Sequence, residues 1–237
     1  MGLRHLMHGV DFRKRVEYEL MLGREATEAI AACPVGYLPI GCLERHGDHL
    51  PMGLDTIKAH GLCCLAARAS GGVVFPPHHY AGIHRMEADE EKRFTEEWGN
   101  LYTVQTARAT LAEIIGQIAR IGVRVLVLYS GHYPGSQVEM IRELASSCST
   151  QALCVIPFAE PMLLDGDHAG ISETSLMLYL DKNRVDMTRI SPVNHREHRW
   201  KAGHFPEDAS LAIGEEQAWE IVEHLARAVA AARAAAN

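Results

Sequence analysis

The stretch VGYLPIGCLERHGDHLPMGLD, residues 35–55, joins an apolar run to a dense group of polar side chains. Its first part, residues 35–43, is short and apolar and ends at a charged residue, a pattern typical of a buried strand. The rest of the stretch contains side chains of types that bind metal ions: Glu44, His46, Asp48, His49 and Asp55. The stretch therefore predicts a buried strand that leads directly into a functional loop.

Three further segments have the same strand pattern: residues 72–76, 123–130 and 152–158. Helical patterns lie between or beyond these segments, at residues 12–32, 56–70, 99–121, 136–149, 172–182 and 212–235. Strands that alternate with helices indicate an α/β fold with a mainly parallel sheet flanked by helices on both faces. We expect one domain over residues 1–237, because this length supports one sizeable core and no linker or repeat divides it.

The composition argues against several classes of partner. The net charge is −7 without a cluster of Lys and Arg, whereas a nucleic-acid surface needs a basic stripe. No apolar run approaches the roughly 20 residues that cross a bilayer, and the N-terminus lacks the apolar core of a signal peptide. The six cysteines lack the paired spacing of a zinc knuckle or a disulfide framework, which indicates reduced thiols. We therefore expect a cytoplasmic protein that acts on a small molecule, with no nucleic-acid or membrane partner.

Three loops that contain histidine are expected at one edge of the predicted sheet. LERHGDH (residues 43–49) and SGHYPG (130–135) each follow a predicted strand, and DGDHAGISE (165–173) follows the last strand after a short loop. Ligands of open parallel sheets bind at the carboxyl ends of the strands. The three loops are therefore expected to converge on one site.

The residue types in these loops favour a metal site. Glu44 and His46 are two positions apart, so in an extended segment both side chains point to the same side. Asp55 lies just before a predicted helix, where its two carboxylate oxygens can bridge two cations. Oxygen ligands mixed with imidazoles suit Zn²⁺, Mn²⁺ or Fe²⁺. No thiolate belongs to this group, which argues against a structural, cysteine-rich zinc site.

In three motifs the sequence resembles the creatinine amidohydrolase (creatininase) family of metal-dependent hydrolases. The motifs are GCLERHGDHLPMGLD (41–55), YSGHYPGS (129–136) and DHAGISETSLML (167–178), and they occur in the order that the family has. The resemblance implies an α/β sandwich whose sheet is flanked by helices. It also implies a homo-oligomer, often a hexamer, and a centre of two divalent metal ions.

The resemblance further implies a division of the metal ligands. Glu44, Asp55 and His132 would hold one metal ion, and His46 with Asp55 would hold part of the second. Such a centre implies metal-assisted hydrolysis, in which the cations activate a water molecule and polarise a substrate carbonyl.

The remaining roles depend on a departure from creatininase itself. That enzyme has a metal-binding Glu two residues after its Gly-His, whereas this chain has Pro134, which offers no ligand side chain. Glu173 is the nearest carboxylate in a matching motif, so it is assigned as the substitute ligand of the second metal and as a catalytic residue. The resemblance implies that His168 is the general acid/base, and an imidazole suits this role because it titrates near neutral pH.

Two segments bear on the substrate. Creatininase has a Trp shortly before its His-Ala-Gly that closes over the planar substrate, but AEPMLLDGD (159–167) contains no aromatic residue, so creatinine itself is not the expected substrate. The loop at residues 75–94 lies where the family has a loop that shapes the substrate pocket. Either His79 or His84 contacts the substrate, or the loop is a solvated connection to an acidic helix.

Three functions remain open at the level of the sequence. The first is hydrolysis of a C–N bond in a small cyclic amide or another amide. The second is hydrolytic C–C cleavage of a cyclic diketone such as a keto-inositol. In that reaction the metals can stabilise the enolate that leaves, whereas cleavage of a C–N bond needs a proton donor for the departing nitrogen. The third is a binding or structural protein that has lost the chemistry, because the fold alone does not guarantee function.

Overall fold

The computed structural model describes residues 10–93, 99–190 and 203–235, and a four-stranded parallel sheet with the strand order β2-β1-β3-β4 lies at its centre. The strands are β1 (Val35–Ile40), β2 (Val73–Val74), β3 (Val125–Ser130) and β4 (Cys154–Phe158). Val35 pairs with Val125, and Val125 pairs with Cys154, so β1, β3 and β4 begin at the same level. The parallel sheet predicted from the sequence is confirmed.

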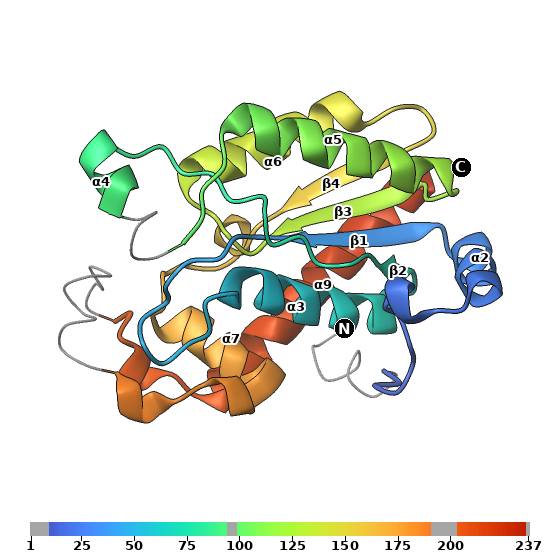
Figure 1. The fold of residues 1–237 in the computed structure, drawn as a ribbon. Coiled ribbons are helices and arrows are strands. Elements are labelled where there is room, and N and C mark those ends of the chain that lie inside the picture. Colours follow the sequence, from blue (N-terminus) through green and yellow to red (C-terminus); the bar gives the residue numbers. More distant parts are fainter. Residues whose placement is uncertain (1–9, 94–98, 191–202, 236–237) are drawn as a thin grey trace.

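Successive residues of the two central strands are buried on opposite faces of the sheet. Tyr37 and Val127 pack with one set of helices, and Leu38 and Leu128 pack with another. The first set is α3 (Leu54–Ser70), α7 (Ile171–Asp181) and α9 (Leu211–Ala235), and the second is α5 (Val104–Arg120) and α6 (Gly135–Cys148). Figure 1 shows the sheet between these layers, with α5 and α6 on one side and α3 and α7 on the other. The expected helices on both faces are therefore present.

The predicted helix over residues 12–32 is wrong in its first half. Helix α2 spans Gly23–Ala32, and a short 3-10 helix, Tyr18–Leu20, precedes it. The backbone N–H of Val74 in β2 donates to the carbonyl of Val16 at 2.8 Å. Because this carbonyl is engaged by the sheet edge, the segment before α2 remains extended.

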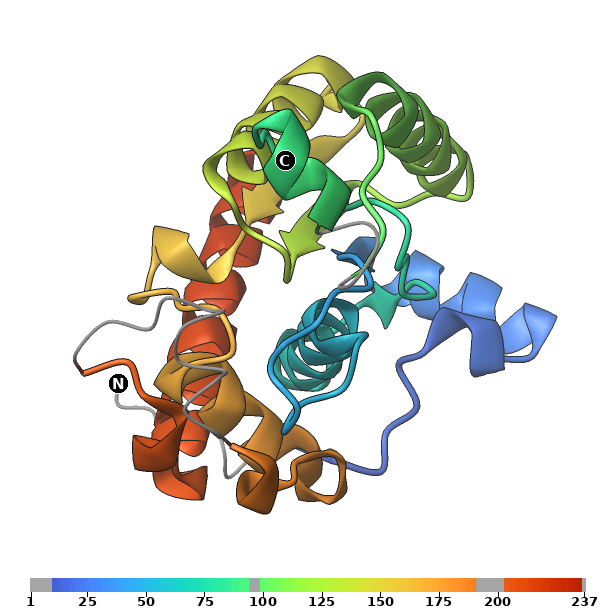
Figure 2. The same cartoon turned by 60° about the vertical axis from the view of Figure 1, so that its left-hand side comes forward.

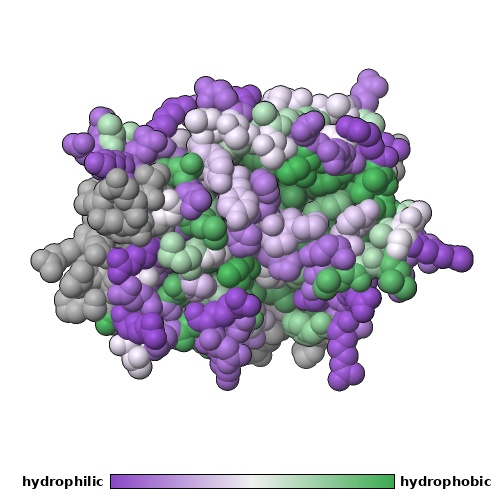
Figure 3. Space-filling view, in the orientation of Figure 1, coloured by the Kyte–Doolittle hydropathy of each residue, from purple (hydrophilic) through white to green (hydrophobic). Residues whose placement is uncertain are grey.

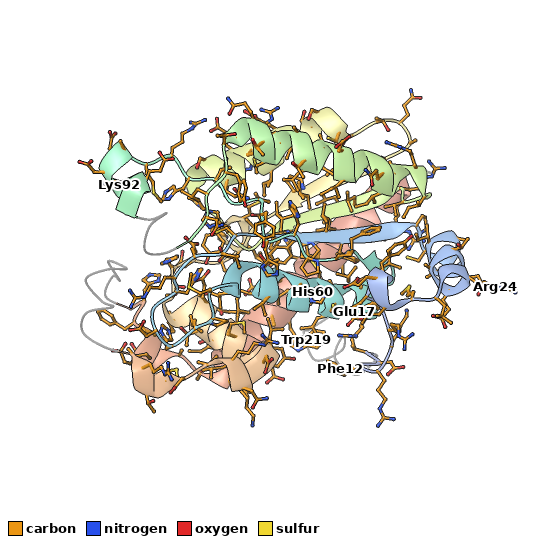
Figure 4. All side chains as sticks on the ribbon, viewed as in Figure 1. Phe12, Glu17, Arg24, His60, Lys92 and Trp219 are labelled. Carbon is orange, nitrogen blue, oxygen red and sulfur yellow. The ribbon has the colours of Figure 1, made fainter. Side chains whose placement is uncertain are left out.

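Two side-chain contacts hold the same segment against the helices. The ring of Phe12 packs edge-on against Trp219 of α9, with the centroids 6.5 Å apart, and Figure 4 labels both. Glu17, which Figure 4 labels near His60, accepts a hydrogen bond from Arg68 of α3 at 3.3 Å. Tertiary contacts therefore override the helical pattern of this segment.

Helix α5 begins five residues later than the sequence pattern predicts. Gly99 forms an antiparallel bridge with Glu44, and the hydroxyl of Thr103 caps the helix by accepting from the backbone N–H of Thr106. A further helix, α4 (Ala88–Arg93), occupies the acidic stretch expected to be helical. Short 3-10 helices lie at Glu160–Met162, Lys182–Arg184, Met187–Arg189 and Pro206–Asp208.

The surface carries mixed polar and apolar groups. Figure 3 shows hydrophilic side chains over most of one face, with apolar groups between them. Leu20 and Leu22, next to α2, are among the large apolar side chains that are exposed. Within the three described ranges, none of the helices has the length and apolar character needed to cross a membrane.

Candidate metal centre

The polar loops meet at the carboxyl edge of the sheet, where parallel strands place their ligands. Glu44 and His46 follow β1, and His132 follows β3. Asp55 lies in the first turn of α3, and Glu173 lies in the first turn of α7. Each of these side chains belongs to a residue that is at most 4% exposed. Figure 2, in which the left-hand side of Figure 1 comes forward, views the molecule from this edge.

The first donor group contains Cys42, Glu44, Asp55 and His132. Nδ1 of His132 lies 2.9 Å from Oε1 of Glu44 and 3.1 Å from Oδ2 of Asp55. The other ring nitrogen of His132 lies 3.2 Å from the carbonyl oxygen of Ile83. A carbonyl can only accept, so in the neutral ring Nε2 carries the proton and the Nδ1 lone pair faces the carboxylates.

The second donor group contains His46, Asp55 and Glu173. Nε2 of His46 lies 3.1 Å from Oδ1 of Asp55 and 3.6 Å from Oε2 of Glu173. Asp55 therefore directs one oxygen to each donor group, Oδ2 to the first and Oδ1 to the second. This is the arrangement required of a carboxylate that bridges two cations.

The environment of His46 shows that the donors fit a cation. Nδ1 of His46 lies 3.2 Å from the carbonyl oxygen of Glu44, which leaves the lone pair of the neutral ring on Nε2. This Nε2 is buried and has no hydrogen-bond partner in the described residues, although carboxylate oxygens surround it. Burial opposes a charge on His46, but Asp55 and Glu173 raise its pKa to about 9. A divalent cation would satisfy the lone pair and the carboxylates together.

His168 lies at the solvent side of these donors, and it forms a third group of possible metal ligands with Glu44 and His46. Its side chain is 37% exposed, and Nδ1 lies 3.9 Å from Oε1 of Glu44. Its Nε2 lies 3.1 Å from the carbonyl oxygen of Arg45, and its ring stacks against His46 with the centroids 4.4 Å apart. Burial, followed by the nearby His46, lowers the pKa of His168. His168 is therefore placed to accept a proton near neutral pH.

A buried lysine behind Glu173 was not identified from the sequence. Nζ of Lys58 lies 2.7 Å from Oε1 of Glu173 and 2.9 Å from Oε2 of Glu160. Tyr133 also donates to Oε1 of Glu173, at 2.8 Å, while Oε2 accepts from the backbone N–H of Ala169 at 2.7 Å. Burial opposes the charge on Lys58, but Glu160 and Glu173 raise its pKa above the usual range. These contacts fix the carboxylate of Glu173 with Oε2 toward His46.

The sequence contains a weak signal for this lysine. Lys58 lies one helical turn after Asp55 in α3, and residues on all sides of that helix are buried. A lysine in a helix that is otherwise mostly apolar can therefore be identified as an internal cation. The sequence does not indicate which residues this cation contacts. The contact with Glu173 spans 115 positions of the chain.

The loop at residues 75–94 supports the site through its backbone. The carbonyl of Ile83 orients His132, and the backbone N–H of Ile83 donates to the side chain of Gln137 in α6 at 2.9 Å. His84 is exposed. Contact of His79 or His84 with a substrate stays a prediction, as do the ligand and catalytic roles assigned above.

The comparisons with known proteins agree with these motifs. The family model described as creatinine amidohydrolase matches residues 19–234. A creatinine amidohydrolase of Pseudomonas putida is 31% identical over 189 residues, which are 70% of this chain and 71% of that protein. The mycofactocin precursor peptide peptidase of Mycobacterium tuberculosis (strain ATCC 25618 / H37Rv) is 25% identical over 204 residues, 81% of this chain and 73% of that protein.

Solved structures of creatininases have a fold similar to that of this chain. A structure named Creatininase Mn has a TM-score of 0.73 at 26% identity and covers 91% of this chain and 98% of its own. A mutant creatininase described as Zn-Zn type has a TM-score of 0.68 at 25% identity, with 91% and 97% covered. The similar proteins thus include manganese and zinc forms.

Proposed function

Because the chain belongs to the creatininase family, we propose that it is a metal-dependent hydrolase that cleaves an amide C–N bond in a small substrate. Two divalent cations, Zn²⁺ or Mn²⁺, would occupy the two donor groups. Glu44, Asp55 and His132 would hold the first cation, and His46, Asp55 and Glu173 would hold the second.

The position of Asp55 between the two donor groups carries this proposal. Its two oxygens lie 3.1 Å from His132 and 3.1 Å from His46, on different sides of the carboxylate. A carboxylate that only capped α3 would direct its oxygens to backbone N–H groups of the first turn. Bridging two donor sets is instead characteristic of a two-metal hydrolase site.

The residues of the chain have distinct tasks in this mechanism. The bound cations would supply Lewis acidity and an activated water for attack on the amide carbonyl. His168 would take the proton of the water and deliver it to the departing nitrogen, because its Nε2 contact with the Arg45 carbonyl leaves Nδ1 toward the site. Lys58 would keep the carboxylate of Glu173 in place.

The relatives and the loop before α7 support an amide as the substrate. The names of both relatives, a creatinine amidohydrolase and a peptide peptidase, describe the cleavage of C–N amide bonds. Neither name describes C–C cleavage, so the cyclic-diketone alternative is not proposed. The segment 159–167 lacks an aromatic residue that could cover planar creatinine, so a different small cyclic or open-chain amide is the proposed substrate.

The test is a metal reconstitution combined with a substrate screen. Chelator-treated protein should regain hydrolysis of one or more amides in a panel of cyclic amides, N-formyl amides and short peptides when Zn²⁺ or Mn²⁺ is added. His168→Gln should bind the same amount of metal but lose at least ~100-fold in kcat. Glu139→Gln, at an exposed position of α6, serves as the control. Full activity of the metal-free protein, or of His168→Gln, would refute the proposal.

We further propose that the protein is a cytoplasmic homo-oligomer, as the family resemblance implies. Leu20 and Leu22 are 59% and 69% exposed and would be covered by such a contact. Light scattering at micromolar concentration should give a mass well above the 26.2 kDa of one chain. A monomeric mass would contradict the proposal.

A further inference from the structure

Cys42 lies in the ligand group, where the sequence predicts no thiolate. It stands two residues before Glu44, and its side chain is fully buried. Its Sγ lies 3.3 Å from Nδ1 of His132 and 3.4 Å from Oδ2 of Asp55. Within the described residues, which include all six cysteines, Cys42 is the one cysteine that belongs to a group of possible metal ligands.

The spacing of residues along the chain places this thiol at the site. Cys42, Glu44 and His46 follow each other at intervals of two, so an extended segment directs all three to one side. The sequence pattern predicts a strand over residues 35–43 and therefore assigns Cys42 to that strand. The end of β1 at Ile40 places it instead in the loop that carries the ligands.

The Cys42 contact has the separation of two donors around a single small cation, and the two carboxylate contacts of His132 are shorter by up to about 0.3 Å. Donor atoms that share a tetrahedral zinc ion, at bond lengths of about 2.0–2.3 Å, lie roughly 3.2–3.7 Å apart. The contacts of His132 Nδ1 with Glu44, Asp55 and Cys42 are 2.9, 3.1 and 3.3 Å. The ligand atoms of the whole group lie within 4.8 Å of one another.

A second feature keeps the thiol in this position. A Cβ on Gly82 would lie 2.3 Å from Cβ of Cys42 and 2.9 Å from its Sγ, so only glycine allows this approach. The next residue, Ile83, uses its carbonyl to orient His132. One loop therefore restrains both the sulfur and the imidazole of the first donor group.

We propose that the thiolate of Cys42 is a ligand of the cation held by Glu44, Asp55 and His132, and that it makes this site select Zn²⁺ over Mn²⁺. The inference rests on the proposed metal-dependent function. When the cation binds, the S–H proton is released to solvent and a metal–sulfur bond forms. A soft sulfur donor favours zinc, whereas an all-oxygen and imidazole set also suits manganese.

Cobalt substitution provides the first test. Chelator-treated protein loaded with Co²⁺ should show the near-ultraviolet charge-transfer band of a thiolate–cobalt bond, together with visible d–d bands. Cys42→Ser, which keeps the size and a polar donor, should lose the charge-transfer band while it retains visible bands from the other ligands. Cys148→Ser, on α6, is the matched control and should keep both. Persistence of the charge-transfer band in Cys42→Ser would refute the proposal.

Metal competition provides the second test. The ratio of the Mn²⁺ to the Zn²⁺ dissociation constant should fall at least about tenfold in Cys42→Ser and stay unchanged in Cys148→Ser. X-ray absorption of the zinc-loaded wild type should show about one sulfur neighbour per two zinc ions, at about 2.3 Å, and this result does not depend on the folding of any variant. Metal bound in both sites without a sulfur neighbour would overturn this inference alone. Failure of the wild type to bind any metal would overturn the proposed function as well.

Discussion

Asp55 and Glu173 are the residues on which the second donor group depends. Asp55 reaches it through Oδ1, and Glu173 reaches it through Oε2, which faces His46 at 3.6 Å. We propose Glu173 as the replacement for the carboxylate that Pro134 cannot provide. Burial opposes a charge on Glu173, but Lys58 and His46 outweigh it and lower its pKa, so the side chain is an anion ready for a cation.

Substitution of Glu173 by Gln removes this charge and retains the size of the side chain. If Glu173 is a ligand, the variant should lose about one of the two metal ions per chain and at least ~100-fold in kcat, while it stays folded. Elemental analysis measures the metal, and circular dichroism monitors the fold. Full metal occupancy in a folded variant would show that Glu173 only orients α7.

Glu160→Gln is the matched control for this experiment. Glu160 also contacts Lys58, at 2.9 Å, and it accepts a hydrogen bond from Tyr129, but it is not among the grouped donors. If the effect of Glu173→Gln came only from an unbalanced lysine, both variants should lose metal equally. We expect metal loss only in Glu173→Gln.

At the scale of elements, the site depends on close packing between the end of β3 and the start of α3. A Cβ on Gly131 would lie 2.0 Å from the carbonyl oxygen of Asp55, so the backbone of the β3 loop touches the first turn of α3. Gly131→Ala would separate the two elements that carry His132 and Asp55. We expect a loss of about 2–4 kcal/mol in the free energy of unfolding, together with weaker metal binding.

Gly135, at the start of α6, is the control for Gly131. A Cβ there meets no heavy atom within 4 Å, so Gly135→Ala should be close to neutral or slightly stabilising. Urea unfolding of both variants, with and without zinc, gives the comparison. Equal stability of the two variants would show that the contact at Gly131 does not hold the site together.

His49 links the loop after β1 to α7 and makes this packing sensitive to pH. Its Nε2 lies 3.0 Å from the hydroxyl of Thr174, and burial, followed by the charge of His46, lowers its pKa to about 4. An unfolded histidine takes up a proton near pH 6.5, whereas folded His49 does so only near pH 4. The unfolded state therefore binds more protons in this window, and stability decreases as the pH falls.

The expected difference is measurable by urea unfolding of metal-free protein at pH 7 and pH 5. The wild type should lose up to about 2 kcal/mol more than His49→Gln between these two values. The comparison of the two proteins removes the contribution of all other titrating groups. Equal losses in both would mean that His49 does not resist protonation in the folded state.

At the scale of the whole molecule, the candidate metal centre concentrates negative charge inside the core. Glu44, Asp55 and Glu173 are all buried within one site, and Lys58 is the buried lysine that contacts it. Ions that bind only the folded state stabilise it, by about 2.7 kcal/mol at a concentration of 100 times Kd. We therefore expect chelation to lower Tm and addition of Zn²⁺ or Mn²⁺ to restore it.

Calorimetry of the wild type and of Asp55→Asn separates stabilisation by bound metal from direct effects of the chelator on the protein. Asp55→Asn lacks the bridging charge, so its Tm should respond weakly to both chelator and metal. An unchanged Tm of the wild type, with removal of the metal verified by elemental analysis, would show that the site contributes nothing to the stability of the fold.

Local sequence patterns were sufficient to locate the strands along the chain and to place the polar loops at one edge of a parallel sheet. Apolar runs such as 123–130 indicate burial, and a parallel α/β order places the loops after those runs at one edge. The sequence alone therefore groups Glu44 with His132. The segment 12–20 could not be predicted, because its helical pattern yields to a bond with Val74 and a contact with Trp219.

The sequence by itself determined the α/β class, the family motifs and the candidate donor residues on the three loops, because each of these depends on short-range spacing. Only the tertiary structure decided that Cys42 points its sulfur at His132 and that Lys58 holds Glu173. These contacts join residues 90 and 115 positions apart. Side-chain neighbours at such separations depend on how helices and loops pack across the sheet, and no local pattern in the chain records that packing.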